Sequence, residues 1–276
     1  MHSRIAAAVG LKHQPVALLW SEEKPAEAMQ FEPGKWGCVM WLAASAAKGR
    51  PGVCDRETFG CFGGGVGAGF GNQYANFPGG EECFCRFLST GNADSADGRQ
   101  AAEAMRPFVR PEFVEHFLHG ERYLQSPEKV EQFIASLPMT EIPARYLLFQ
   151  PLTAVDPAQQ TPQTVVFFAD PDQLSAMVVL ANYGRGDNEN VFIPWGAGCQ
   201  TVGIYPYREA LRERPRGVVG LTDLSARLYL RRQLGDGLLS FAAPWSLFQE
   251  MEENVDGSFL QGDTWQALLA AKGQGE

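Results

Sequence analysis

The chain has 276 residues, 45% of them hydrophobic, and a formal net charge of −9. A chain of this length can bury a substantial core and lies near the upper limit of what one core supports. We therefore expect one domain over residues 1–276, or two closely packed halves at about 1–140 and 141–276. The acidic balance argues against nucleic acids and anionic membranes, because these polyanions would repel such a surface. The partners that remain are small molecules and proteins, including a second copy of the chain.

The start of the chain and its cysteine usage indicate a cytoplasmic protein. No apolar run approaches the ~20 residues that cross a bilayer, and the apolar stretch at residues 5–8 is too short for a signal peptide. In a reducing cytoplasm the six cysteines are not expected to form disulfides. Five of them lie between residues 38 and 85, and this crowding calls for a chemical explanation.

Hydrophobic periodicity and helix-end signals predict an alternation of helices and strands. Helices are expected over residues 3–10, 38–48, 96–105, 111–119, 127–137, 171–183, 224–233, 246–255 and 264–272, and strands over 15–20, 145–151, 164–169, 202–205, 217–221 and 238–242. Residues 49–80 are so rich in glycine that we expect a long glycine- and cysteine-rich loop region. The elements alternate without a strict β-α repeat, so the fold class is α/β or α+β, with a mixed sheet flanked by helices.

Two parts of the chain resemble each other weakly. Residues 16–20 and 165–169 are both apolar strands, each followed by an Ala-Met pair in a predicted helix and later by a cysteine next to glycine. If this echo reflects an internal duplication, Cys38 and Cys199 approach one another across a pseudo-twofold axis.

The cysteines have the chemistry of a metal centre. Thiolates are the soft ligands that iron–sulfur clusters and zinc prefer, and a closed site needs four. No pair shows the C-x2-C spacing, which weakens a zinc-ribbon or ferredoxin interpretation. Cys38 is placed at the start of a predicted helix, where the dipole favours a thiolate that suits either a metal or a nucleophilic role. The alternative is that these cysteines, Cys83 and Cys85 above all, are simply buried small apolar residues.

The glycines beside the cysteines allow two interpretations. Backbone amides of Gly63, Gly64, Gly65 and Gly198 can donate hydrogen bonds to the sulfurs of a bound cluster. The same glycines can instead let two backbone segments pack closely. Neither G-x-G-x-x-G nor the phosphate-binding G-x-x-x-x-G-K-[ST] pattern occurs, so nucleotide binding is not favoured.

Several separated motifs resemble the DUF169 family. They are residues 15–17, Cys38 with its Ala-rich helix, residues 54–64, and the turn at 196–199, and the resemblance spans about residues 11–255. The family is uncharacterised and common in anaerobic prokaryotes, so the resemblance implies a cysteine-bearing fold and no particular reaction. It matches Cys38, Cys61 and Cys199 to recurring cysteine positions of the family, and Cys54 less closely. Cys83 and Cys85 are additional to the family pattern.

These observations lead to one expected function with two alternatives. The first is a [4Fe–4S] protein with an electron-transfer or redox accessory role, whose cluster is bound by Cys38, Cys54, Cys61 and Cys199. In it Cys83 or Cys85 replaces a ligand or lies behind one, and a redox protein or a small molecule exchanges electrons with the cluster. The alternatives are a thiol-dependent enzyme that acts on an anionic small molecule, and a zinc-stabilised or metal-free binding module. Whether the protein is an enzyme stays open.

Overall fold

A computed structural model describes residues 1–272 of the chain. The chain forms two compact units, one made of residues 1–70 together with the chain from residue 140 onward, and the other of residues 71–139. This division differs from the expected halves at about 1–140 and 141–276. Residues 71–139 are instead an insertion into the first unit.

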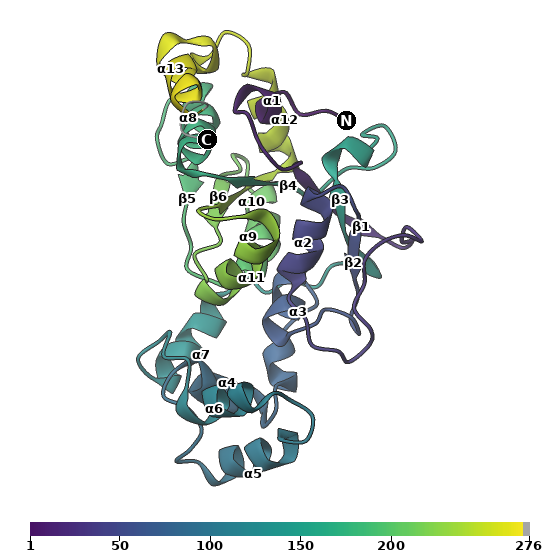
Figure 1. Ribbon diagram of the computed structural model, residues 1–276, viewed down its shortest axis with the longest axis vertical. Helices are drawn as coiled ribbons and strands as arrows, with labels where there is room; N and C mark the ends of the chain where they lie inside the picture. Colours follow the sequence, from purple (N-terminus) through teal and green to yellow (C-terminus); the bar gives the residue numbers. More distant parts are fainter. Residues whose placement is uncertain (273–276) are drawn as a thin grey trace. The chain divides into compact units, whose positions relative to one another are not determined.

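The first unit is built on a mixed seven-stranded sheet, so the fold is α+β (Figure 1). The strand order is β2-β3-β1-β4-β7-β6-β5, in which β5 and β6 pair parallel and the other neighbours pair antiparallel. The strands are β1 (Val16–Ser21), β2 (Gly52–Cys54), β3 (Tyr146–Pro151), β4 (Thr164–Ala169), β5 (Val191–Phe192), β6 (Gly217–Gly220) and β7 (Leu239–Pro244).

The central strands are mostly apolar because both faces of the sheet are covered. One face carries Leu19, Phe167 and Phe241 in a core with Phe248 and Trp265. The helices on this side are α1 (Arg4–Ala8), α8 (Pro171–Tyr183), α12 (Trp245–Glu253) and α13 (Asp263–Lys272). The opposite face is covered by α2 (Val39–Ala47), α9 (Gly198–Val202) and α10 (Ile204–Ala210), and α11 (Leu224–Leu234) packs against α2. Short 3-10 turns, η2 (Leu152–Ala154) and η3 (Phe259–Gln261), complete this unit together with α3 (Phe62–Ala68).

Two halves of the sheet repeat the same topology. Strands β1 and β4 lie antiparallel at the centre, β3 and β7 flank them, and β2 and β6 come next, so that β1, β2 and β3 correspond to β4, β6 and β7. The registers agree: β1 pairs with β3 from Val16 and Pro151 onward, as β4 pairs with β7 from Thr164 and Pro244 onward. The helices repeat in the same way. Helix α2 packs against α11, and their counterparts α9 and α3 pack against each other. The echo between residues 16–20 and 165–169 therefore corresponds to a repeat in the structure. The predicted Ala-Met helix after residues 16–20 is not part of this repeat. Met29 forms a bridge to the strand residue Gly52 and does not belong to a helix.

The second unit is helical. It contains η1 (Gln73–Asn76), α4 (Gly80–Leu88), α5 (Ala96–Met105), α6 (Pro111–His119) and α7 (Pro127–Ser136). Its interior is aromatic: the ring of Phe77 lies 5.2 Å from that of Phe84, 5.3 Å from that of Phe87 and 5.9 Å from that of Phe117. The helices predicted in this region are present, and α4 is a helix that the sequence did not predict.

Two predicted features of the chain need correction. Residues 49–80, expected as a long loop region, also contain the short elements β2, α3 and η1, and less than half of the segment belongs to them. The expected strand at 202–205 is the junction of α9 and α10. Glycine costs a helix about 1 kcal/mol relative to alanine at each interior position, so the sequence Phe-Gly-Gly-Gly-Val-Gly-Ala of α3 has little intrinsic tendency to be helical. Its close packing against α9 offsets that cost.

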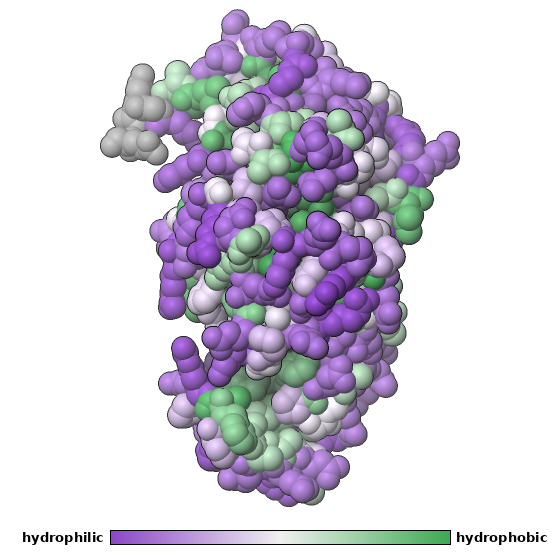
Figure 2. All heavy atoms as spheres, turned by 90° about the vertical axis from the view of Figure 1, so that its right-hand side faces the viewer, coloured by the Kyte–Doolittle hydropathy of each residue, from purple (hydrophilic) through white to green (hydrophobic). Residues whose placement is uncertain are grey.

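Figure 2 shows one face of the molecule, on which hydrophilic side chains predominate. The apolar side chains on this face form small groups, with the broadest toward the lower end of the view. Within residues 1–272, no helix is both long enough and apolar enough to span a bilayer.

Candidate functional site

Three of the predicted site cysteines lie at the beginnings of three helices of the first unit. Cys38 is the N-cap of α2, Cys61 is the N-cap of α3, and Cys199 is the second residue of α9. Helix α9 contacts both α2 and α3, which brings the three thiols together. Their proximity has an electrostatic effect, because negative charge on Cys61 raises the pKa of both Cys38 and Cys199.

One peptide group lies between two of these sulfur atoms. The Sγ of Cys61 accepts a hydrogen bond from the backbone N–H of Gly64 at 3.3 Å, and the Sγ of Cys199 donates to the carbonyl oxygen of Gly63 at 3.0 Å. The N–H of Gly64 and the C=O of Gly63 belong to the same peptide and point in opposite directions. The two sulfurs therefore lie on opposite sides of it.

A carboxylate that the sequence analysis did not single out belongs to the same group. Asp223 is the N-cap of α11, and its Oδ1 accepts from the backbone N–H groups of Ser225 at 2.9 Å and Ala226 at 3.3 Å. Its Oδ2 accepts from the N–H of Gly198 at 3.2 Å, one residue before Cys199. In the sequence, Asp223 stands just before a predicted helix. That position indicates a helix cap, but it does not predict which other residues the carboxylate contacts.

The thiols of this group are protonated near neutral pH. Burial is the largest cause in each case, and it raises the pKa of Cys38 to about 12, raises that of Cys61, and raises that of Cys199 well above its usual value. The negative charge of Asp223 adds to the rise for all three, while backbone N–H groups lower the pKa only in part. The helix dipole was expected to make Cys38 a thiolate. Burial and the neighbouring negative charges outweigh it.

The glycines of α3 let its backbone touch that of α9. A Cβ on Gly67 would lie 2.6 Å from the carbonyl carbon of Cys199, and a Cβ on Gly203 would lie 1.9 Å from the carbonyl oxygen of Gly67. Close backbone packing, one of the two interpretations of the glycine-rich run, therefore holds for Gly67, and Gly203 of the facing segment contributes to the same contact.

The four glycines predicted to bind a cofactor have different roles in this arrangement. Gly63 and Gly64 contact sulfur atoms through their shared peptide. The amide of Gly65 is occupied by the carbonyl of Cys61, and that of Gly198 by Asp223.

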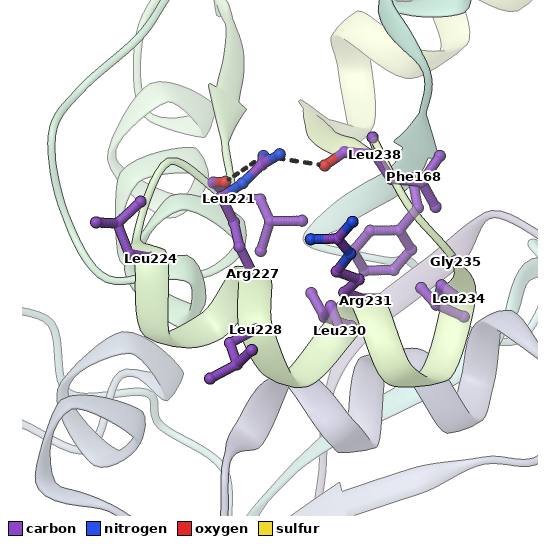
Figure 3. A pocket seen from close by; sticks show the side chains of 11 residues that line it. Phe168, Leu221, Leu224, Arg227, Leu228, Leu230, Arg231, Leu234, Gly235 and Leu238 are labelled. Carbon is purple, nitrogen blue, oxygen red and sulfur yellow. Dashed lines mark hydrogen bonds between the residues drawn. The ribbon is translucent and has the colours of Figure 1, made fainter.

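The chain between β6 and α11 is held in a strained conformation. Leu221 has φ of 62°, a left-handed value that bulky residues rarely adopt, and its side chain is buried. The guanidinium of Arg227 donates to the carbonyls of Leu221 and Leu238, each at 3.2 Å (Figure 3). Beside these contacts is a pocket of about 310 Å³ lined by one face of α11, Phe168 and Leu238. This bracing fixes the turn that carries Asp223.

The other three predicted cysteines lie elsewhere. Cys54 is on β2 with no exposed surface, and its negative charge would act on Tyr207 of α10. Cys83 and Cys85 are buried on α4 of the second unit, where burial is the main cause that raises their pKa. They lie on a helix that the sequence did not predict. The structure thus brings together Cys38, Cys61 and Cys199, but not Cys54.

As the side chains stand, no three His, Cys, Asp or Glu residues in the described part of the chain are arranged to hold a metal ion. The peptide of Gly63 and Gly64 between two of the sulfurs is a physical reason.

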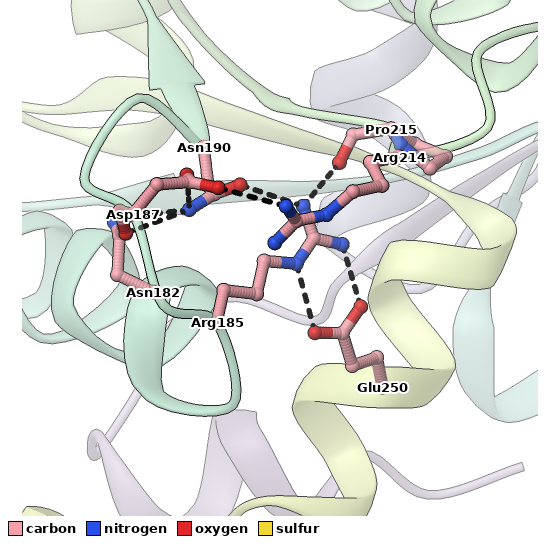
Figure 4. Close-up of polar contacts among 7 residues, drawn as sticks. All are labelled: Asn182, Arg185, Asp187, Asn190, Arg214, Pro215 and Glu250. Atoms are coloured by element: carbon pink, nitrogen blue, oxygen red, sulfur yellow. Dashed lines mark hydrogen bonds and ion pairs between the residues drawn. The ribbon is translucent and has the colours of Figure 1, made fainter.

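A second polar group in the first unit is structural. The guanidinium of Arg185 pairs with both carboxylate oxygens of Glu250 and also donates to Asn190 and to the carbonyl of Pro215 (Figure 4). The side chain of Arg185 is only 6% exposed. These bonds join the end of α8 to α12 and to the segment before β6, which accounts for its burial without a ligand.

Fold and site together define an α+β protein with three protonated thiols and one carboxylate gathered at helix starts. The chain belongs to DUF169, the family described as uncharacterised ArCR, whose model matches residues 4–254. No curated protein and no solved structure matches the chain.

Proposed function

We propose that this protein binds a [4Fe–4S] cluster at the centre formed by Cys38, Cys61 and Cys199, and that the cluster serves electron transfer or an accessory redox role. The observation that carries the proposal is the gathering of these three thiols, from positions far apart in the sequence, at the starts of packed helices. Thiolate sulfur is the ligand that iron–sulfur clusters require.

The electrostatics of the centre favour a metal over a nucleophile. The charged group that acts on all three thiols is negative, namely Asp223, and a thiolate formed at Cys61 would further oppose ionisation of Cys38 and Cys199. A nucleophilic cysteine needs a nearby positive charge or base to form its thiolate at neutral pH. A metal cation supplies that positive charge itself and displaces the thiol protons on binding. This comparison disfavours the thiol-dependent enzyme.

The location also suits electron exchange. Cys38 and Cys61 are partly exposed, whereas Cys199 is buried with 7% of its surface exposed. A cluster bound here would have one side toward solvent, where a redox protein or small molecule can approach, and one side in the protein interior. Backbone N–H groups at the starts of α2 and α3 would stabilise the negative charge of its sulfur atoms.

Zinc is the second candidate, because the same soft donors bind it. The absence of sulfide distinguishes a zinc site from a cluster. A metal-free binding module is the third possibility, and it predicts that neither metal is present.

The test is a purification without oxygen, followed by a visible spectrum and assays of iron, zinc and acid-labile sulfide. We expect a coloured protein that contains iron and sulfide in about equal amounts. Zinc without sulfide would replace the cluster by a zinc site. A colourless protein free of all three, and still so after chemical cluster reconstitution, would contradict the proposal.

Single substitutions then locate the site. Cys61→Ala and Cys199→Ala should each remove most of the bound metal, since the loss of a ligand destabilises the centre. Cys54→Ala and Cys85→Ala are the matched controls, because they delete buried thiols that are not in this group. Equal metal loss in both sets would mean that the site is misplaced.

A further inference from the structure

The pocket beside α11 combines an apolar lining with positive charge (Figure 3). Its volume of about 310 Å³ is at the lower end of the range for small-molecule sites. Six leucines and Phe168 supply apolar side chains, and Arg227 and Arg231 supply the charged ones. Among the described residues, no acidic side chain lines the pocket. The lining is therefore positive in a chain whose net charge is −9.

The guanidinium of Arg227 has one edge in use and one edge free. Both hydrogens of its Nη1 are donated, one to the carbonyl of Leu221 and one to that of Leu238, each at 3.2 Å. Within residues 1–272, the Nε and Nη2 of Arg227 have no hydrogen-bond partner, and its charge pairs with no carboxylate. Two neighbouring N–H groups of a guanidinium bind one planar carboxylate through parallel hydrogen bonds. The free edge of Arg227 therefore fits a carboxylate.

Arg231, one helical turn further along α11, shows the same edge occupied. Its Nε donates to Oδ1 of Asp236 and its Nη2 donates to Oδ2, the latter at 3.0 Å. Asp236 belongs to the loop that follows the helix. The two arginines line one pocket, and the protein supplies a carboxylate to Arg231 but, in its described part, none to Arg227.

The position of Arg227 is fixed before any ligand binds. Its two bonds to main-chain carbonyls hold the guanidinium in place, and a pre-organised group loses less entropy on binding than a mobile one. One of these carbonyls belongs to Leu221, whose φ of 62° is the kind of strained conformation that is frequent at ligand sites. Bracing this turn uses Nη1 alone and leaves the other edge of Arg227 without a role.

We propose that this pocket binds a small organic acid with an apolar body. The carboxylate pairs with Nε and Nη2 of Arg227, and the carbon chain or ring lies against the leucines and Phe168. The site is separate from the thiol group, although Leu221 connects the two. Leu221 lines the pocket, and its Cδ1 would lie 3.5 Å from a Cβ on Gly198 at the start of α9. The proposal therefore does not depend on metal binding by the thiols.

The lining selects this class of ligand over other charged molecules. An amine would be repelled by the guanidinium of Arg227. A phosphate dianion carries more charge than this one edge neutralises, and the leucines offer no hydrogen bonds to its remaining oxygens. An apolar carboxylic acid satisfies both parts of the pocket, since its anionic end is paired and its carbon atoms leave water.

Calorimetric titration of the purified full chain with hexanoate and with benzoate tests the proposal. We expect saturable binding of at least one of these acids. Acetate lacks most of the carbon chain and should bind roughly tenfold or more weakly than hexanoate. Hexanamide keeps the chain but lacks the charge, and it should also bind roughly tenfold or more weakly.

Two substitutions place the binding in this pocket. Arg227→Lys keeps a positive charge but removes the planar edge, and it should weaken hexanoate binding roughly tenfold or more. Leu228→Glu leaves Arg227 in place and adds a negative charge to the lining, so it should also weaken binding. Leu228 is 54% exposed, so this change does not disturb the core. Arg232→Lys is the matched control, because Arg232 is an exposed residue of the same helix that does not line the pocket.

Circular dichroism and thermal unfolding show whether each variant is folded. Hexanoate binding that weakens in Arg227→Lys and Leu228→Glu, and stays unchanged in Arg232→Lys, would establish the site. If neither acid shows saturable binding, or if the folded Arg227→Lys and Leu228→Glu variants bind as the unaltered protein does, the proposal is wrong. Inorganic phosphate bound as tightly as hexanoate would overturn the assignment to apolar acids. The iron, zinc and sulfide assays decide the proposed function separately.

Discussion

Cys61 and Cys199 contact opposite sides of one peptide group: the Sγ of Cys61 accepts from the N–H of Gly64, and the Sγ of Cys199 donates to the carbonyl of Gly63. The two cysteines are far apart in the sequence, and each belongs to the start of a different helix. The contact depends on how closely α3 and α9 approach, and that approach depends on glycine.

Gly67→Ala should destabilise the protein by about 1–3 kcal/mol, the usual cost of overpacking. Alanine favours helix by up to about 1 kcal/mol over glycine, but the new Cβ would lie 2.6 Å from the backbone of Cys199, which cannot simply move aside. Urea denaturation measures the change. Gly186→Ala is the control, since a Cβ there meets nothing within 4 Å. Equal effects of the two substitutions would contradict the close packing of α3 and α9.

The buried carboxylate of Glu209 should make stability depend on acid pH. Its side chain has 0% exposure. Burial opposes its ionisation, but the hydrogen bonds and charge of Arg216 and the charges of Arg212 and Arg208 outweigh burial and lower the pKa of Glu209 below 4.5. The unfolded chain therefore binds more protons. The stabilisation is fully present above about pH 4.5 and is lost as the pH falls through the lower folded pKa.

Glu209→Gln tests this directly. Removing one partner of a buried ion pair typically costs about 3–5 kcal/mol, and the substitution should also flatten the acid dependence of the unfolding free energy. Asp236→Asn serves as the comparison, because Asp236 and Arg231 form an exposed pair in the same unit and should contribute little. An unchanged pH profile for Glu209→Gln would be inconsistent with this explanation.

The metal-free protein should react slowly with alkylating reagents. Only the thiolate is nucleophilic, and burial with neighbouring negative charge raises the pKa of Cys38 to about 12. At pH 8 the folded protein should therefore be alkylated more than about tenfold more slowly than the urea-unfolded chain, and the rate should rise with pH up to that pKa. Mass spectrometry after timed quenching gives the rate at each cysteine. Rapid alkylation of Cys38 at neutral pH would instead favour the thiol-dependent enzyme.

Arg185→Ala should lower stability without affecting bound metal. It removes a nearly buried guanidinium and leaves Glu250 and the carbonyl of Pro215 without these bonds, at an expected cost of about 2–4 kcal/mol (Figure 4). Arg214→Ala removes a pair with Asp187 in which both side chains are exposed, so it should cost no more than about 1 kcal/mol. Thermal unfolding and metal assays on both variants decide whether this network is purely structural.

The sequence by itself determined the long apolar strands, most helices and three of the cysteines that meet in the structure. The strands β1 (Val16–Ser21), β3 (Tyr146–Pro151) and β4 (Thr164–Ala169) lie within a sheet buried on both faces, and that leaves a nearly continuous apolar signal in the chain. Cys38, Cys61 and Cys199 were recognisable because thiols are rare and chemically distinctive. The repeat between the first and fourth strands was also visible, faintly, as an echo of apolar residues.

Only the tertiary structure decided which side chains meet. Asp223 carries an ordinary capping signal. Cys38 and Cys61 lie more than a hundred residues before it in the sequence, so no local signal predicts that it is near their thiols. The helix α3 could not be predicted because its glycines oppose helix formation locally and are stabilised by contact with α9. Cys54 carries the same thiol as Cys38 and Cys61. Its pairing with Leu147 in the sheet nevertheless places it outside their group. Local propensity and residue chemistry act through neighbouring residues, whereas a site of this kind is made by contacts between distant ones.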